Sequence, residues 1–192
     1  VGGRLARLRP SLETNLAVLA GGVAALGLPP YPWTGVLVPF GLGLLFVLLH
    51  RAGRPGRTAW VFGLAHQIVV LHWLFLLIPA KSIPTRALVP VQAIAAIVYV
   101  SLFYLVLGWV YGQLRRRLGP ARALLLLPPL WTAMEALRSV GELGFPWCLT
   151  GSCVAGTPLL PLVRTAGELG VGAAVALLAV AFAAVRLRPR LG

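Results

Sequence analysis

Residues 87–117, ALVPVQAIAAIVYVSLFYLVLGWVYGQLRRR, begin with a long apolar run that has no charged side chain and end in three consecutive arginines. About 20 apolar residues are enough for a helix to cross the hydrocarbon core of a bilayer. Arginines that flank such a helix concentrate on its cytoplasmic side. This stretch therefore predicts a membrane-spanning helix and also the direction in which it runs.

The composition of the whole chain agrees with this stretch. Of 192 residues, 59% are hydrophobic and 11% are charged, and the mean hydropathy is +0.90. Such a chain is too apolar for a soluble domain. We predict an all-α polytopic membrane protein whose residues 1–192 form a single transmembrane domain. Its six expected helices cover about 12–28, 35–49, 59–79, 87–113, 121–138 and 166–185.

The net charge of +13 is distributed unevenly along the chain. Most arginines precede the first expected helix, separate helices two and three or four and five, or follow the sixth. Only Lys81, Arg86, Arg138 and Arg164 fall on the other side. The positive-inside rule then predicts that both termini are cytoplasmic, with the first helix retained rather than cleaved as a signal peptide. Because anionic lipid headgroups account for the basic residues, we expect no nucleic-acid partner.

The segment 139–165, between expected helices five and six, differs from the other connections. It is rich in glycine and proline and yet apolar, so it cannot be a regular helix throughout. Irregular backbone at membrane depth is tolerated where it is buried in protein or lines a cavity. We therefore expect an irregular outer segment that dips into the membrane or packs on the bundle and forms a substrate recess.

Three side chains of the helix before this segment carry most of the functional signal. Trp131, Glu135 and Arg138 project from one helical stripe, with the two charges about one turn apart. Ionisable groups at membrane depth mark functional sites by default. The alternative is an intrahelical ion pair that neutralises itself near the headgroups.

The inventory of reactive groups excludes several chemistries. The sequence contains no aspartate, so a Ser-His-Asp triad is excluded. Its glutamates are scattered and His66 and His72 point in different directions, so we expect no metal and no cofactor. Cys148 beside Lys81 is a conceivable nucleophile, but the sequence offers no signature of an activated thiolate. Cys148 and Cys153 are interpreted as two thiols, with a disulfide as the alternative.

Taken together, Pro128-Pro129-Leu130-Trp131, Glu135, Leu137-Arg138, Gly144-Phe145-Pro146-Trp147 and Gly151 resemble the membrane domain of bacterial apolipoprotein N-acyltransferase. Weaker matches are Pro29-Pro30-Tyr31 with Trp33, His72-Trp73-Leu74, and Gly167, Gly170 and Val171. The resemblance implies transfer of an acyl chain from a phospholipid to the N-terminal diacylglyceryl cysteine of a lipoprotein, in the bacterial inner membrane. In that family a nitrilase-like domain outside the membrane performs the chemistry.

No stretch of this chain has the strand and helix pattern of such a domain, so we assign no catalytic residue here. We expect a truncated or split form that is not competent alone and relies on a separate nitrilase-like domain. Alternatives are a non-catalytic lipid-binding scaffold and a small transporter, although a transporter should show paired broken helices. The lipid or substrate recess is predicted to use Trp131, Glu135, Arg138, Phe145, Pro146, Trp147 and Gly151.

Overall fold

The computed structural model describes residues 9–30, 33–78 and 86–187, and these residues are all-helical without a β-strand. The α-helices are α1 (Pro10–Leu26), α2 (Leu37–Arg51), α3 (Pro55–Val70), α4 (Val89–Leu118), α5 (Pro120–Leu125), α6 (Leu127–Arg138) and α7 (Pro161–Leu187). Short 3₁₀ helices are η1 (Thr34–Val36), η2 (His72–Leu77), η3 (Arg86–Leu88) and η4 (Thr150–Val154). The expected loop 79–84 with Lys81, the pair Tyr31-Pro32, and Arg4, Arg7, Arg188 and Arg190 lie outside the described residues.

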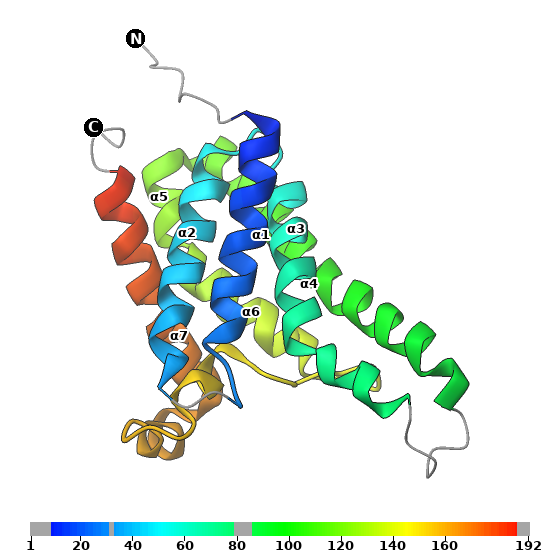
Figure 1. The fold of residues 1–192 in the computed structure, drawn as a ribbon. Helices are drawn as coiled ribbons and strands as arrows, with labels where there is room; N and C mark the ends of the chain where they lie inside the picture. The colour runs from blue at the N-terminus through cyan, green and yellow to red at the C-terminus, as the bar shows by residue number, and fades with distance from the viewer. Residues whose placement is uncertain (1–8, 31–32, 79–85, 188–192) are drawn as a thin grey trace.

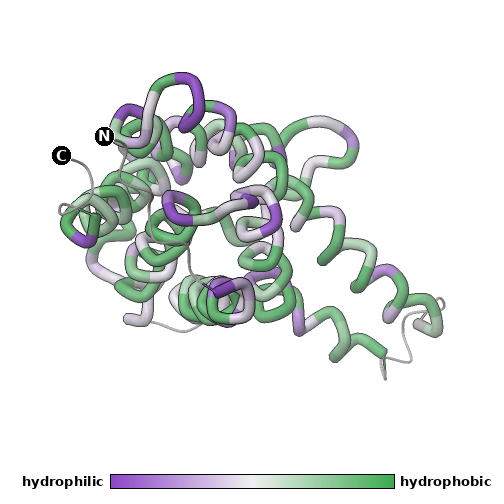
Figure 2. The backbone as a smooth tube through the Cα atoms, turned by 90° about the horizontal axis from the view of Figure 1, so that it is seen from above, coloured by the Kyte–Doolittle hydropathy of each residue, from purple (hydrophilic) through white to green (hydrophobic). Residues whose placement is uncertain are grey.

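Among the described residues, three helices are long and apolar enough to cross a membrane by length and composition: Thr34–Arg51, Val89–Leu118 and Pro161–Leu187. In Figure 1 the helices form a bundle, and the first half of α4 diverges from it together with η2. The backbone is apolar along most of the helices, and hydrophilic residues gather mainly at turns and helix ends (Figure 2). The expectation of an all-α protein with membrane-spanning helices is confirmed at this level.

Prolines set several helix boundaries. The expected helix 121–138 is two helices, because Pro128 and Pro129 lack the N–H groups that would continue α5 and instead occupy the first turn of α6. Similarly, Pro55 begins α3 four residues before its expected start. Pro39 lies in the first turn of α2, where the backbone N–H groups have no partner within the helix, so its missing N–H breaks no helical hydrogen bond.

Small residues allow the helices to approach one another closely. Ala20 and Ala24 of α1 are fully buried, and a Cβ on Gly41 of α2 would lie 2.6 Å from the backbone nitrogen of Ala24. In lipid, where apolar side chains gain little from leaving the solvent, such close contact is a main source of helix association. The first two helices are therefore held by backbone proximity rather than by large side chains.

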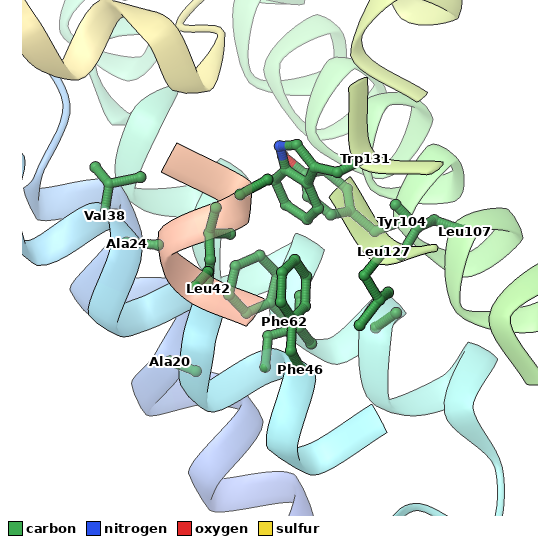
Figure 3. Packing of buried hydrophobic residues seen from close by; sticks show 14 of the residues in the cluster. Ala20, Ala24, Val38, Leu42, Phe46, Phe62, Tyr104, Leu107, Leu127 and Trp131 are labelled. Atoms are coloured by element: carbon green, nitrogen blue, oxygen red, sulfur yellow. The ribbon is translucent and has the colours of Figure 1, made fainter. Parts of the chain in front are cut away.

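An aromatic cluster fills the centre of the bundle (Figure 3). Trp131 of α6 packs its ring edgewise against Phe46 of α2, Phe62 of α3 and Tyr104 of α4, with centroid distances of 6.0, 6.4 and 5.7 Å. Edge-to-face pairs at these distances contribute beyond their buried area. Trp131 thus joins four helices and fixes the rotation of α6.

Most of the segments that carry arginine in the described chain meet at one end of the bundle. The start of α1, the turn from α2 to α3, the junction of α4 with α5 and the end of α7 all lie there (Figure 1). We call this the arginine-rich end. The opposite end, where residues 139–160 connect α6 to α7, is called the loop end.

Candidate functional site

The three stripe residues of α6 all point into the protein. Trp131, Glu135 and Arg138 are at most 2% exposed, so the charged pair does not lie free at a surface. Arg138 Nη2 lies 3.9 Å from Glu135 Oε1. Buried charges persist only when hydrogen bonds and opposite charges compensate the lost hydration, so their partners define what they do.

Glu135 holds the beginning of η4. Its Oε1 accepts hydrogen bonds from the backbone N–H and the hydroxyl of Thr150, both at 2.7 Å. The same hydroxyl accepts a bond from Trp131 Nε1 at 2.9 Å. A hydroxyl can donate once and accept at the same time, so Thr150 links the carboxylate to the central tryptophan. The carboxylate also caps the first turn of η4, which has no side-chain cap of its own.

Arg138 binds the polypeptide of the following segment. Nη1 donates to the carbonyl oxygens of Phe145 and Trp147 at 3.1 and 3.3 Å, and Nη2 donates to that of Cys148 at 3.2 Å. The backbone N–H of Phe145 in turn donates to the Arg138 carbonyl at 2.6 Å. The guanidinium therefore organises residues 145–148, for which no regular backbone ladder exists.

The remaining candidates of the segment separate into exposed and buried positions. Pro146 and Trp147 are exposed, and Trp147 packs on Trp73 of η2 with ring centroids 5.2 Å apart. Phe145 is half-buried against the core. Gly151 is buried, and any side chain there would collide with the backbone carbonyl of Glu168 at the kink of α7. The structure thus brings Trp131, Glu135, Arg138 and Gly151 into the interior and leaves a proline-tryptophan pair outside.

An apolar groove of about 410 Å³ runs between α4 and α6. Its lining includes Phe103 and Val106 on α4 and Met134 and Leu137 on α6. Tyr99, which also lines the groove, donates a hydrogen bond from its hydroxyl to the carbonyl of Leu143 at 3.0 Å. Residues 139–148 are consequently tied to α4 as well as to α6, and they cross at the loop end of the groove.

The two cysteines are free thiols. Burial raises the pKa of Cys148, and burial together with the nearby Glu135 carboxylate raises that of Cys153 from 9.0 to about 11. A raised pKa keeps a thiol protonated and therefore poorly nucleophilic. Lys81, which the sequence offered as a conceivable but unsupported activator of Cys148, lies outside the described residues. Within the described residues, no group of three His, Cys, Asp or Glu side chains is arranged to hold a metal ion.

Sequence reasoning missed Thr150, Tyr99 and the groove. Thr150 belongs to no helical or strand pattern that the sequence shows. Its hydrogen bonds with Glu135 and Trp131 form only because the chain folds back between residues 139 and 150. Two buried atoms at this site, Glu135 Oε2 and Arg138 Nε, have no hydrogen-bond partner among the described residues. Gly172 of α7 lies against that carboxylate oxygen, since a Cβ there would be 3.0 Å from it.

Comparison with known proteins supports one family. Residues 20–181 match the family described as apolipoprotein N-acyltransferase N-terminal domain. Proteins named apolipoprotein N-acyltransferase from several bacteria are similar to this chain. The one from Gloeobacter violaceus is 33% identical over 189 residues, covering 89% of this chain and 34% of that protein. The one from Verminephrobacter eiseniae is 32% identical over 192 residues, covering 91% and 35%.

The relative from Pseudomonas aeruginosa is 28% identical over 160 residues, covering 79% of this chain and 30% of that protein. The chain therefore spans about a third of the length of the curated relatives it matches. These matches confirm the resemblance that the sequence motifs indicated.

Proposed function

Because this chain belongs to the apolipoprotein N-acyltransferase N-terminal domain family, we propose that it forms the membrane domain of such an acyltransferase in the bacterial inner membrane. By the family resemblance, the reaction cleaves an acyl ester of a phospholipid and forms an amide with the amino group of a diacylglyceryl cysteine on a lipoprotein. The domain's contribution is to hold lipid-bearing substrates, because the resemblance assigns the chemistry to a nitrilase-like domain.

The proposed topology has six crossings, made by α1, α2, α3 with η2, α4, α5 with α6, and α7. Both described chain ends lie at the arginine-rich end (Figure 1), which fits an even number of crossings. The gathering of arginines at that end supports a cytoplasmic location for it. The loop end then faces the periplasm, where a lipoprotein substrate is accessible.

The groove between α4 and α6 is the proposed entrance for an acyl chain. It is apolar, and Val106 and Leu137 in its lining are exposed at the outside of the bundle. The segment that leads to Phe145, Pro146 and Trp147 is tied to this groove by the hydrogen bond from Tyr99 to the Leu143 carbonyl. The groove is the observation that carries this assignment, since a lipid tail needs an apolar surface and exposed aromatic rings suit the headgroup level. Trp147 and Pro146 would meet the lipid near its ester bonds.

Glu135 and Arg138 have a positioning role in this proposal. Glu135 Oε1 already accepts from Thr150, and both terminal nitrogens of Arg138 already donate to the carbonyls of residues 145–148, so a lipid phosphate would have to compete with the protein's own backbone. The pair therefore sets the shape of the entrance and does not bind the headgroup. We assign no catalytic residue, because the described residues contain no strand from which an α/β domain is built.

Crosslinking with a phospholipid that carries a photoreactive diazirine in one acyl chain tests this assignment. Adducts should concentrate on α4 and α6, and Val106→Trp, which fills the groove, should remove most of them. Leu19→Trp is the matched control, because Leu19 is similarly exposed on α1, outside the groove. Adducts spread evenly over all lipid-facing helices and unchanged in Val106→Trp would contradict the entrance.

A genetic test addresses the division of labour. Cells depleted of their own acyltransferase should not grow when they produce this chain alone, because the chemistry needs a nitrilase-like domain. Growth on the chain alone would refute that part of the proposal. If the groove binds lipid but no nitrilase-like partner restores growth either, the alternative of a non-catalytic lipid-binding scaffold is favoured.

A further inference from the structure

A second cavity lies at the arginine-rich end, far from the loop end. It has a volume of about 540 Å³ between the beginning of α3 and the second half of α4. Close packing of the two helices forms its floor, since a Cβ on Gly56 of α3 would lie 3.5 Å from the backbone nitrogen of Trp109 on α4. The functional-site residues of α6 do not line it.

Three cationic side chains surround this cavity. Arg54 and Arg57 come from the start of α3 and Arg116 from the end of α4, and all three are exposed. Arg116 Nη2 donates to Gln113 Oε1 at 2.6 Å, which holds its guanidinium beside the opening. Planar guanidinium groups bind phosphate oxygens with paired hydrogen bonds, so three of them around one cavity suit a phosphate group.

The backbone and an indole add further donors. No side chain caps the beginning of α3, and its first-turn N–H groups carry the positive end of the helix dipole. Trp60 lines the same cavity, and its Nε1 is buried without a hydrogen-bond partner among the described residues. A buried indole N–H without a partner is costly, and an acceptor oxygen in the cavity would remove that cost.

One acidic side chain is bonded to this part of α3. The Thr58 hydroxyl donates to Glu13 Oε1 of α1, and neither residue lines the cavity. Glu13 thus lies on the α1 side of α3, whereas the three arginines line the cavity between α3 and α4. The local charge on the cavity side remains strongly positive.

The rest of the lining indicates what kind of phosphate fits. Leu105 and the exposed ring of Trp109 form the side of the cavity that continues along α4, one of the candidate membrane spans. A ligand that fills the cavity meets donors at its head and an apolar helix surface below it. We propose that this cavity binds the phosphate headgroup of an anionic phospholipid in the leaflet that faces the arginine-rich end.

This site is separate from the proposed acyl entrance, and its lipid is bound without being consumed. It anchors the start of α3 to α4 and adds an external anion to an end of the bundle that has excess positive charge. Failure of the acyl-entrance tests would leave this proposal intact, because the two sites share no residue.

Native mass spectrometry of the detergent-purified chain tests the proposal with phosphatidylglycerol and phosphatidylcholine of identical acyl chains. We expect tighter binding of phosphatidylglycerol. The triple variant Arg54→Gln, Arg57→Gln, Arg116→Gln should weaken it by roughly a hundredfold, since each arginine near an anionic lipid contributes about fivefold. Trp60→Phe, which keeps an aromatic ring but removes the N–H, should weaken it by roughly tenfold.

The matched control is Arg9→Gln, Arg117→Gln, Arg122→Gln, which removes the same charge from exposed positions outside the cavity. It should bind phosphatidylglycerol within about threefold of the parent chain, and equal weakening in both triple variants would overturn the proposal in favour of general charge attraction. A third arm adds millimolar inorganic phosphate. Complete displacement of phosphatidylglycerol would show that the site takes free phosphate, which would overturn the lipid assignment.

Discussion

Two arginines at opposite ends of the molecule bind backbone carbonyls, but their surroundings differ. At the arginine-rich end, Arg115 donates to the carbonyls of Leu49, His50 and Ala52 at the end of α2. At the loop end, Arg138 donates to three carbonyls of residues 145–148 with Glu135 beside it. The end of a helix supplies aligned carbonyls and a dipole that favours a cation. The irregular segment has no such dipole, and its carbonyls are brought together only where Arg138 binds them.

The comparison shows that the charged side chains at the loop end are bound within the protein, whereas those at the arginine-rich end are accessible to a ligand. At the loop end, Glu135 and Arg138 use their hydrogen bonds to hold the segment that carries Trp147. At the arginine-rich end, several arginines remain exposed around an open cavity. The positions that look most functional in the sequence therefore shape the site, and less conspicuous arginines are free to meet lipid.

The largest effect is expected for Arg138→Ala. The change leaves three carbonyls without their donor and a buried carboxylate without its counter-charge, so we expect a loss of about 3–5 kcal/mol in the free energy of unfolding. Equilibrium unfolding in mixed detergent micelles measures it. Arg117→Ala, at an exposed position, should stay within about 0.5 kcal/mol.

A double variant tests whether the Glu135 and Arg138 side chains depend on each other. Glu135→Gln combined with Arg138→Met should cost less than the two single changes added together, because no charge is then left buried and unpaired. Strict additivity would show that the two side chains do not depend on each other.

The next largest loss in the free energy of unfolding is expected for Gly151→Ala. Its Cβ would collide with the backbone carbonyl of Glu168, and since backbone atoms cannot rotate away, we expect a loss of about 1–3 kcal/mol. Gly22→Ala is the matched control, because nothing lies within 4 Å of that position and alanine favours a helix. Equal stability of the two variants would contradict the close packing of η4 on α7.

Arg115→Ala should cost less than Arg138→Ala, about 1–2 kcal/mol by the same unfolding measurement. The change releases three carbonyl oxygens at the end of α2, but it leaves no carboxylate without its counter-charge, so the penalty is smaller than for Arg138→Ala. A cost equal to that of Arg138→Ala would remove the distinction between the two ends.

The smallest effect on stability is expected at the loop-end thiols, where the change is one of reactivity. Because the pKa of Cys153 is raised from 9.0 to about 11, its thiolate fraction at pH 8 should be roughly a hundredfold below that of an ordinary thiol. Alkylation of Cys153 in a Cys148→Ser chain should accelerate as the pH rises towards 11. A rate that levels off near pH 9 would contradict the environment described here.

Much of the fold was predictable because apolar runs, prolines and arginines act locally. The 3.6-residue period also placed Trp131, Glu135 and Arg138 on one face, and all three do point inward. Their partners were not predictable. Thr150 reaches Glu135 only after residues 139–149 fold back, and Tyr99 reaches Leu143 from a different helix; both contacts join residues far apart in the sequence. The division of residues 121–138 by Pro128 and Pro129 was available in principle from the missing N–H groups, but hydropathy alone obscured it.

The proposed topology requires that the two ends of the bundle lie on opposite sides of the membrane. Single cysteines at exposed positions test this in a Cys148→Ser, Cys153→Ser chain: Leu143→Cys at the loop end and Arg117→Cys at the arginine-rich end. A membrane-impermeant maleimide added to cells with a permeabilised outer membrane should label Leu143→Cys at once. It should label Arg117→Cys only after the inner membrane is opened. Labelling of Arg117→Cys from outside, with Leu143→Cys protected, would contradict the account.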